Sequence, residues 1–323
     1  MTDRDYPSAV TRAFIPDEIL TLAHERAAAR AARDWAAADR IRAEIEAAGW
    51  KIVDRGADFA LEPAHPPTVA EGELVRYGTS DAVPSRLDER ATGAATVIVV
   101  ATDWPADVER ALAAVRSHTP AGTSIVVVAD GPSPDQDAAL PPSDDEVEIV
   151  RTTERLGTGA AWNIGFRRAA AEVVLILDAS VEPTGDIVTP LVRALADPNV
   201  GVAGGFGIVS ADLRRFSDAP PGDVTAVEAY ALAFRRADAA ARGPVDERFR
   251  FYRNLDIWWS LVLRDEGEGS APRRAVAVPI PAIRHEHRGW TSVGEAERDR
   301  LSKRNFYRII DRFGWRRDLA TPS

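Results

Sequence analysis

Between residues 94 and 200, short apolar runs alternate with stretches that repeat apolar residues at helical spacing. Unbroken apolar runs, which are typical of strands buried on both faces of a sheet, occupy residues 96–100, 123–128, 147–150 and 173–177. Residues 105–117 and 157–171 carry the helical pattern. Because strands that alternate with helices pair in parallel, we expect an α/β, Rossmann-like fold with helices on both faces of a mostly parallel sheet.

The chain beyond residue 183 has a less regular pattern, which predicts further helices and strands. Helical patterns cover residues 187–196, 255–264 and 295–313, and strand patterns cover residues 200–208 and 275–280. Residues 225–234 fit either a strand or a helix. Residues 134–145 are acidic and rich in proline, which predicts a loop, and residues 285–290 predict another.

The first 62 residues predict a small helical module. One helix begins after Pro16, and a second begins near Asp34 and ends at Gly49, where a short extended segment follows. Proline and glycine then recur over residues 63–93, which predicts a linker. We therefore expect three parts, namely a helical hairpin module over residues 1–62, the linker over residues 63–93 and an α/β domain over residues 94–323.

Composition limits the classes of function. A net charge of −10 argues against a general nucleic-acid-binding protein. The sequence has no cysteine, which excludes disulfides and thiolate metal sites. No stretch reaches the roughly 18 apolar residues of a membrane span, and no signal-peptide core is present, so we expect a cytoplasmic protein without a transmembrane segment. The basic, aromatic stretch from Lys303 to Arg317 fits a peripheral membrane contact or, as we prefer, a helix packed on the domain.

The apolar run at residues 173–177 ends in three side chains that carry oxygen atoms, Asp178, Ser180 and Glu182. Ligands of open α/β sheets bind just beyond the carboxyl ends of the strands, and such oxygen atoms suit a hard divalent cation. The alternative is a strand that ends in a turn, with Asp178 capping the next segment. Taken alone, the stretch favours the turn, and only the neighbouring sequence favours a ligand site.

Six segments, in the same order, resemble the family 2 glycosyltransferases, which are inverting enzymes of the GT-A fold. The resemblance covers about residues 94–315 and rests on TVIVVATDW, IVVVADGPS, RLGTGAAWNIGFRRA, LILDASVEP, VEAYALAFRRADAAARGPVDERF and HEHRGWTS. It implies a GT-A domain that moves a sugar from a nucleoside-diphosphate sugar to an acceptor hydroxyl, with Mn²⁺ or Mg²⁺ at the donor diphosphate. The sequence identifies neither the sugar nor the acceptor.

The resemblance also implies a set of metal ligands. Asp178 takes the place of the first acid in the family's metal-binding Asp-x-Asp, and His287 takes that of a late histidine that completes the site. Ser180 stands where the second acid is expected. Since a hydroxyl binds such cations more weakly than a carboxylate, we expect Glu182 to compensate.

The remaining donor contacts follow from the same resemblance. Asp130 is expected to accept a hydrogen bond from the nucleobase, although Ala129 replaces the acid that precedes it in the family. Gly157 and Asn163 fit a loop close to the nucleotide, and helix capping is the alternative role of Asn163. Arg288 is expected to hold phosphate.

An inverting transfer needs a general base that deprotonates the acceptor hydroxyl. The family's Glu-Asp pair aligns with Arg253 and Asn254, which cannot act as bases at neutral pH. Asp256, two residues further on, is the candidate catalytic base, and its alternative role is that of an acid at a helix N-terminus. Ser180 and the Arg253-Asn254 pair also motivate a different function, that of a non-catalytic protein that binds nucleotide sugars.

Residues 17–62 resemble the C-terminal helical appendage of cysteinyl-tRNA synthetases, through the segment HERAAARAARDWAAADRIRAEIEAAGWKIVDRG. No nucleotide-binding or zinc motif of a synthetase occurs elsewhere in the sequence. The resemblance implies a module for an RNA or protein contact, which makes an RNA-associated factor a third candidate function. We favour a hairpin that docks on the main domain or on a second copy of the chain, because so small a module needs a partner surface.

Overall fold

The computed structural model describes residues 15–56, 58–101 and 103–320. The chain divides into two compact units, residues 1–67 and 68–323. The sequence predicted a linker over residues 63–93, and here the structure differs. Two short strands within residues 68–93 extend the sheet of the second unit, so this stretch is part of that unit.

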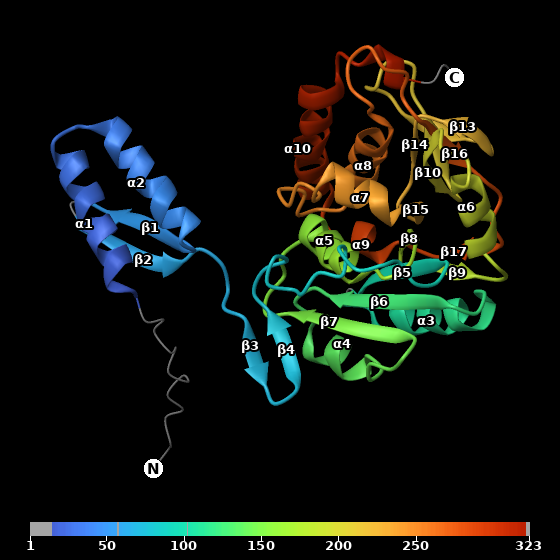
Figure 1. Ribbon diagram of the computed structural model, residues 1–323, viewed down its shortest axis with the longest axis horizontal. Helices are drawn as coiled ribbons and strands as arrows, with labels where there is room; N and C mark the ends of the chain where they lie inside the picture. Colours follow the sequence, from blue (N-terminus) through green and yellow to red (C-terminus); the bar gives the residue numbers. More distant parts are fainter. Residues whose placement is uncertain (1–14, 57, 102, 321–323) are drawn as a thin grey trace. The chain divides into compact units, whose positions relative to one another are not determined.

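The first unit is a helical hairpin with a two-stranded antiparallel sheet (Figure 1). Its elements are α1 (Asp17–Ala31), α2 (Trp35–Ala47), β1 (Trp50–Arg55) and β2 (Asp58–Pro63). Asp34 begins α2, since its side chain accepts a hydrogen bond from the backbone N–H of Ala37 at 3.0 Å. Ile19, Ile41 and Ile45 are buried in its core. The predicted helical hairpin is therefore confirmed.

A mixed ten-stranded sheet forms the centre of the second unit. Its strands are β3 (Val69–Glu71), β4 (Leu74–Tyr77), β5 (Ala95–Ala101), β6 (Thr123–Ala129), β7 (Val147–Thr152), β8 (Val173–Leu177), β10 (Val200–Gly204), β13 (Gly222–Val224), β15 (Ala231–Arg235) and β16 (Arg274–Ala277). They lie in the order β13-β16-β10-β15-β8-β5-β6-β7-β4-β3. From β8 to β4 the neighbouring strands are parallel, whereas β15 is antiparallel to both of its neighbours.

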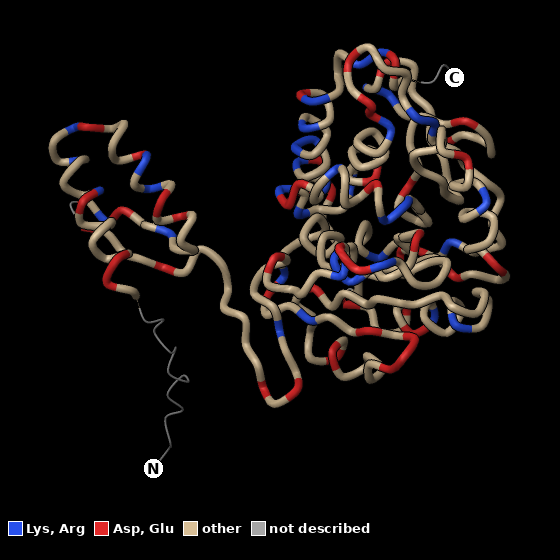
Figure 2. The backbone as a smooth tube through the Cα atoms, viewed as in Figure 1, with Lys and Arg blue, Asp and Glu red and all other residues tan. Residues whose placement is uncertain are grey.

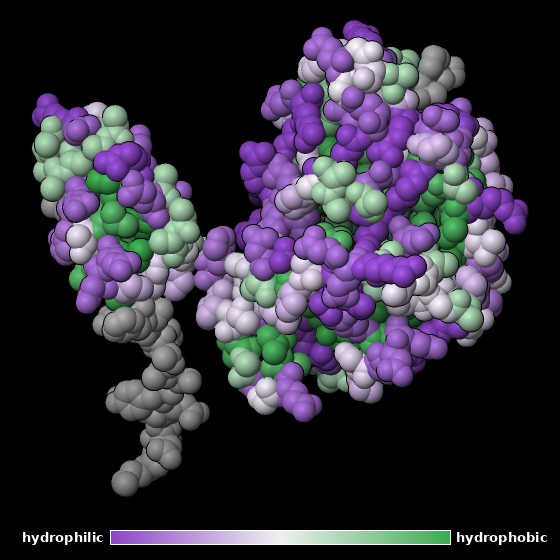
Figure 3. All heavy atoms as spheres, viewed as in Figure 1, coloured by the Kyte–Doolittle hydropathy of each residue, from purple (hydrophilic) through white to green (hydrophobic). Residues whose placement is uncertain are grey.

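Helices cover both faces of this sheet (Figure 1), which confirms the predicted α/β fold. The α-helices of this unit are α3 (Pro105–His118), α4 (Pro134–Ala139), α5 (Thr158–Arg168), α6 (Val188–Leu195), α7 (Arg236–Arg242), α8 (Leu255–Arg264), α9 (Arg288–Thr291) and α10 (Glu295–Phe313). Along β5, Val97 and Val99 belong to the core beneath α3 and α6, while Ile98 belongs to the core beneath α5 and α8. On the face in Figure 3, hydrophilic residues cover most of the unit.

Two smaller sheets complete the second unit. β9 (Val181–Pro183) pairs antiparallel with β17 (Ala282–Arg284). β11 (Gly207–Val209) lies between β12 (Ser217–Ala219) and β14 (Ala226–Val227). Residues 225–234, for which the sequence allowed a strand or a helix, therefore contain the strands β14 and β15.

The two predicted loops contain short helices. Ser133 begins α4 by accepting a hydrogen bond from the backbone N–H of Gln136, and Pro134 suits the first helical position, where its missing N–H costs nothing. α9 begins inside the segment predicted as a loop at residues 285–290 and ends one residue beyond it.

The closing helix α10 carries many Lys and Arg side chains (Figure 2). It packs on α8, and its residues Ile309 and Phe313 are buried in the same core as that helix. The expectation of a packed helix therefore holds for this stretch. None of the helices in the described part of the chain is both long and apolar enough to cross a membrane.

Candidate active site

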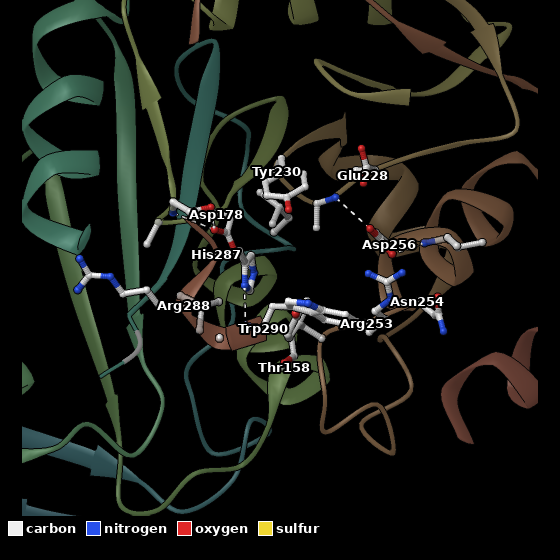
Figure 4. A pocket seen from close by; sticks show the side chains of 18 of the residues that line it. Thr158, Asp178, Glu228, Tyr230, Arg253, Asn254, Asp256, His287, Arg288 and Trp290 are labelled. Carbon is white, nitrogen blue, oxygen red and sulfur yellow. Dashed lines mark hydrogen bonds and ion pairs between the residues drawn. The ribbon is translucent and has the colours of Figure 1, made fainter. Parts of the chain in front are cut away.

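A cavity of about 620 Å³ lies where β5 and β8 end (Figure 4). It extends from Val100 and Ile176, near the carboxyl ends of those strands, to the first turn of α8, and α9 borders it. Acidic, basic and aromatic side chains line it, among them Asp178, Glu228, Arg253, Asp256, His287, Arg288 and Trp290. This is the place in an open α/β sheet where ligands bind.

Asp178 is the first residue beyond β8, and the structure brings it next to His287. The His287 Nε2 atom lies 3.2 Å from the Asp178 Oδ2 atom. Burial opposes ionisation of Asp178, but the hydrogen bond and charge of His287 outweigh burial, so the pKa of Asp178 lies below its usual value. Burial likewise disfavours charge on His287, yet its contact with Asp178 raises the pKa of the imidazole.

The β9–β17 pairing brings these two residues together. β9 begins three residues after Asp178, and β17 ends three residues before His287. The backbone N–H of His285 continues the ladder by donating to the Ser180 carbonyl at 2.8 Å. Main-chain hydrogen bonds thus hold two segments together that are more than a hundred residues apart in the sequence.

The His287 ring is fixed from several sides. Its Nδ1 atom accepts a hydrogen bond from the backbone N–H of Trp290 at 3.1 Å, which makes His287 the N-cap of α9. The Tyr252 ring stacks on it with 4.5 Å between centroids, and Tyr230 meets it edge-on at 6.1 Å. Since Nδ1 accepts a hydrogen bond, the neutral ring in this arrangement carries its proton on Nε2, which faces Asp178. For Nε2 to bind a cation, this proton would have to move to Nδ1, and the hydrogen bond from the Trp290 N–H would be lost.

Ser180 and Glu182 have different surroundings. Ser180 lines the cavity, and both its backbone N–H and its hydroxyl donate to Asp178 Oδ1. Glu182 does not line it. The Glu182 carboxylate lies 2.6 Å from His285 Nε2 and 3.8 Å from Arg110 Nε, because Glu182 belongs to β9, which pairs with β17. We expected Glu182 to make up for Ser180, which binds cations weakly. The geometry does not favour this, because the Glu182 carboxylate contacts His285 and Arg110 instead.

The donor atoms fit a divalent cation that takes further ligands from a substrate. Within the described residues, no three histidine, cysteine, aspartate or glutamate side chains are grouped closely enough to hold a metal ion. The 3.2 Å between Asp178 Oδ2 and His287 Nε2 is close to the edge of about 3 Å of an octahedron whose ligands lie about 2.1 Å from the ion. Mg²⁺ and similar cations commonly take one or two protein ligands and complete their shell with phosphate and water.

Asp130 and Gly157 fix the loop that precedes α5. The Asp130 carboxylate accepts hydrogen bonds from the backbone N–H groups of Leu156 at 2.7 Å and Gly157 at 2.9 Å. Burial raises the pKa of Asp130, and these hydrogen bonds offset part of that effect. Gly157 has φ 103°, and a Cβ atom there would lie 2.7 Å from the Arg250 Cα atom. Neither residue lines the cavity, and the predicted nucleobase contact of Asp130 stays a prediction.

Asn163 lies buried in the middle of α5 and holds a distant turn. Its Nδ2 group donates to the Val245 carbonyl and to Glu247 Oε1, each at 2.9 Å, and its Oδ1 atom accepts from the Val245 backbone N–H at 2.8 Å. Helix capping, the alternative from the sequence, is wrong because α5 begins and ends elsewhere. The predicted nucleotide contact is replaced by these bonds, and Asn163 does not line the cavity.

Arg288 and Asp256 both line the cavity, on opposite sides of His287 in Figure 4. The Arg288 Nε atom lies 3.4 Å from Asp107 Oδ2 on α3. The Asp256 carboxylate accepts hydrogen bonds from the backbone N–H groups of Ala229 at 3.2 Å and Ile257 at 2.9 Å. Burial raises the pKa of Asp256, against the effect of these hydrogen bonds.

The sequence did not single out three further residues that line the cavity. The guanidinium groups of Arg253 and Arg298 lie over the Trp290 ring, 4.6 Å and 4.2 Å from its centroid. The place of Trp290 in the HEHRGWTS segment was a signal for it. Glu228 had a similar signal, since it lies in the VEAYALAFRRADAAARGPVDERF segment. Tyr252, which stacks on His287, lies outside the six segments and had none. Burial and the neighbouring Asp256 raise the pKa of Glu228 to about 7.

The α/β unit matches known sugar transferases. Residues 96–242 match the model of the glycosyl transferase family 2. An N-acetylglucosaminyltransferase of Bradyrhizobium elkanii is 30% identical over 111 residues, which are 33% of this chain and 61% of that protein. The crystal structure of GalNAc-T7 with UDP, GalNAc and Mn²⁺ shares the fold, with a TM-score of 0.53 and 17% identity over 69% of this chain and 48% of that chain.

The N-terminal segment matches a different class of protein. A cysteine–tRNA ligase of Opitutus terrae is 48% identical over 60 residues, which are 19% of this chain and 13% of that protein. The resemblance of this segment to cysteinyl-tRNA synthetases is thereby confirmed. The chain spans less than two thirds of the length of each of these relatives.

Proposed function

We propose that this chain is a metal-dependent, inverting enzyme that moves a sugar from a nucleoside-diphosphate sugar to an acceptor hydroxyl. The match of residues 96–242 to the model of the glycosyl transferase family 2 supports this proposal. The observation that carries the proposal is the pair of Asp178 and His287, 3.2 Å apart at the rim of the cavity. The shared fold with GalNAc-T7, whose crystal structure contains UDP, GalNAc and Mn²⁺, agrees with this proposal.

On the donor side, Asp178 and His287 would hold the cation, which when bound offsets the negative charge of the leaving diphosphate. The lowered pKa of Asp178 keeps its carboxylate ionised at neutral pH and ready to bind. The Ser180 hydroxyl is bonded to Asp178 and orients that carboxylate. Arg288 lines the same region, and we assign it to the phosphate oxygens.

On the acceptor side, the cavity offers carboxyl groups near the N-terminus of α8. An inverting transfer needs one of them to accept the proton of the attacking hydroxyl. Asp256, the candidate from the sequence, lines the cavity and remains a proposed participant in this step. The side chain of Trp290, over which the guanidinium groups of Arg253 and Arg298 lie, borders the same space.

Thermal unfolding with and without Mn²⁺, in the presence of UDP, GDP, dTDP or CMP sugars, tests the donor site. We expect one class of nucleotide to raise the Tm in the presence of Mn²⁺, because a ligand that binds the native state stabilises it. Asp178→Ala should abolish this shift. Glu182→Gln should preserve it, since Glu182 faces His285 and Arg110 instead of the cavity.

Two results would contradict the proposal. An unchanged Mn²⁺-dependent shift in Asp178→Ala would remove Asp178 from the metal site. Nucleotide binding without turnover over a broad panel of acceptor hydroxyls would favour the non-catalytic binding protein, which the Ser180 and Arg253-Asn254 departures motivate.

A further inference from the structure

Glu228 is a carboxyl group of the cavity whose oxygen atoms are free to meet a ligand. It lies in the turn between β14 and β15, and its side chain is 24% exposed. Within residues 15–56, 58–101 and 103–320, no donor lies at hydrogen-bonding distance from its carboxylate. The nearest cationic atom is Arg284 Nη1, 3.7 Å from Glu228 Oε2.

Arg284 is held at this distance by two aromatic rings. Its guanidinium group lies 4.8 Å from the Phe206 centroid and 4.6 Å from the Tyr230 centroid. A guanidinium stacked in this way neutralises part of the charge of Glu228 without donating a hydrogen bond to it. The carboxylate therefore keeps its lone pairs for a group that enters the cavity.

Asp256 differs from Glu228 in this respect. Each of its oxygen atoms accepts a backbone hydrogen bond, Oδ2 from Ala229 and Oδ1 from Ile257. Ala229 directly follows Glu228, so Asp256 ties the N-terminus of α8 to the turn that carries Glu228 (Figure 4). The same turn reaches the donor side, where the Tyr230 carbonyl accepts a hydrogen bond from the Asp178 backbone N–H at 3.2 Å.

We propose that Glu228 is the catalytic base that takes the proton of the acceptor hydroxyl, and that Asp256 is a positioning residue for it. This inference rests on the proposed function. As the acceptor oxygen forms its bond to the anomeric carbon, its proton passes to a Glu228 oxygen. The bond from the anomeric carbon to the diphosphate breaks, and the leaving diphosphate takes the electron pair.

The charges around Glu228 suit this task. The groups that face it are Asp256 and Arg253 at α8, Asp218 on β12, Arg284 on β17 and the adjacent Tyr230. Burial, Asp256 and Asp218 raise the pKa of Glu228, and Arg284 and Arg253 lower it, which leaves it at about 7. A base with a pKa near the working pH is both substantially ionised and able to accept a proton.

The test compares Glu228→Gln with the wild-type chain and with Glu286→Gln, an exposed glutamate that does not line the cavity. Release of nucleoside diphosphate from UDP-N-acetylglucosamine and GDP-mannose is measured with Mn²⁺, to water and to a panel of sugar hydroxyls. We expect Glu228→Gln to lose about 100-fold or more in kcat with an unchanged donor KM and an unchanged Mn²⁺-dependent Tm shift by UDP or GDP.

The pH profile separates the roles of the two carboxyl groups. The base acts when ionised, so the wild-type kcat should rise with pH through an apparent pKa near 7. Glu228→Gln should lack this rise, and Glu228→Asp should keep a reduced rate that still has it. Asp256→Asn should move the rise to lower pH, because it removes a negative charge that raises the pKa of Glu228.

The outcomes are distinct. A wild-type kcat and pH profile in Glu228→Gln would overturn this inference. If the rise of kcat with pH disappears only in Asp256→Asn, the catalytic base is Asp256 and not Glu228. If the wild-type chain neither binds nor turns over any nucleotide sugar, the proposed function fails and the inference falls with it. A donor-binding Tm shift in each variant verifies that its fold is intact.

Discussion

At the scale of single residues, the side chains of the site are held by partners from distant segments of the chain. Asp178 and His287 were predicted from their segments, and the structure brings them together. Glu182 and Asn163 were expected at the same site, but their bonds go to His285 and to the turn at Val245. Those partners come from distant segments, so no local pattern reveals which way either side chain turns.

The pH dependence of stability gives a residue-scale prediction for Glu228. Its pKa is about 7 in the folded chain against a usual value of 4.5, so between these values the folded state keeps a proton that the unfolded chain has lost. Stability from this group therefore falls as the pH rises from about 4.5 to about 7. We expect Glu228→Gln to be more stable than wild type at pH 8, by at most about 3 kcal/mol, and by less than about 1 kcal/mol at pH 5.

Thermal unfolding of both variants across this pH range checks the prediction. Glu286→Gln serves as the control, because its exposed side chain should leave the pH dependence as in the wild type. A gain of equal size at pH 5 and pH 8 would show that the folded-state pKa of Glu228 is near its usual value.

At the scale of elements, α5 and the turn at residues 244–247 form one tightly packed joint. Asn163 bonds this turn, and Gly159 lets it approach so closely that a Cβ atom would lie 2.8 Å from the Asp246 carbonyl. The sequence predicted a glycine-containing loop and an asparagine near the site. It did not predict that they serve packing, because the turn they contact lies more than eighty residues further along the chain.

Removal of the Asn163 side chain should therefore destabilise the fold. Asn163→Ala leaves the backbone N–H and carbonyl of Val245 buried without these partners, which costs about 1–3 kcal/mol. Urea unfolding should show a lower midpoint with an unchanged slope. Asn199→Ala, which removes only an exposed contact with Asp197, should change stability by less than about 0.5 kcal/mol. Equal effects of the two substitutions would refute the role assigned to Asn163.

At the scale of the whole molecule, the alternation of apolar runs and amphipathic stretches was sufficient to predict the α/β unit. The predicted strands at residues 96–100, 123–128 and 173–177 match β5, β6 and β8 within about one residue at each end. The attachment of β4 to β7 was not predictable, because its short sequence, Leu74 to Tyr77, carries no signal for its partner. The antiparallel direction of β15 depends in the same way on pairing with distant strands.

The division into two units predicts that donor binding belongs to the second one. Residues 68–323 contain the cavity and the cores on both faces of the sheet. A chain that lacks residues 1–67 should therefore keep the Mn²⁺-dependent Tm shift with nucleotide. Loss of this shift in a folded, truncated protein would show that the hairpin module contributes to the site.

The same truncated chain tests the hypothesis that the hairpin module binds RNA. A filter-binding titration with tRNA at several salt concentrations compares the full and shortened chains. Since the net charge is −10, we expect neither to bind tRNA strongly at physiological salt. Salt-dependent binding that disappears with residues 1–67 would instead support an RNA contact by the hairpin.

The β9–β17 ladder has a consequence for how this site tolerates change over evolution. Main-chain hydrogen bonds join the segments that carry Asp178 and His287, with Glu182 opposite Ile283. Substitutions at these strand positions can therefore accumulate while the two ligands keep their spacing. A single inserted or deleted residue in either strand would turn the following side chains to the opposite face. The spacing of the two ligands should therefore tolerate substitutions in these strands but not insertions or deletions.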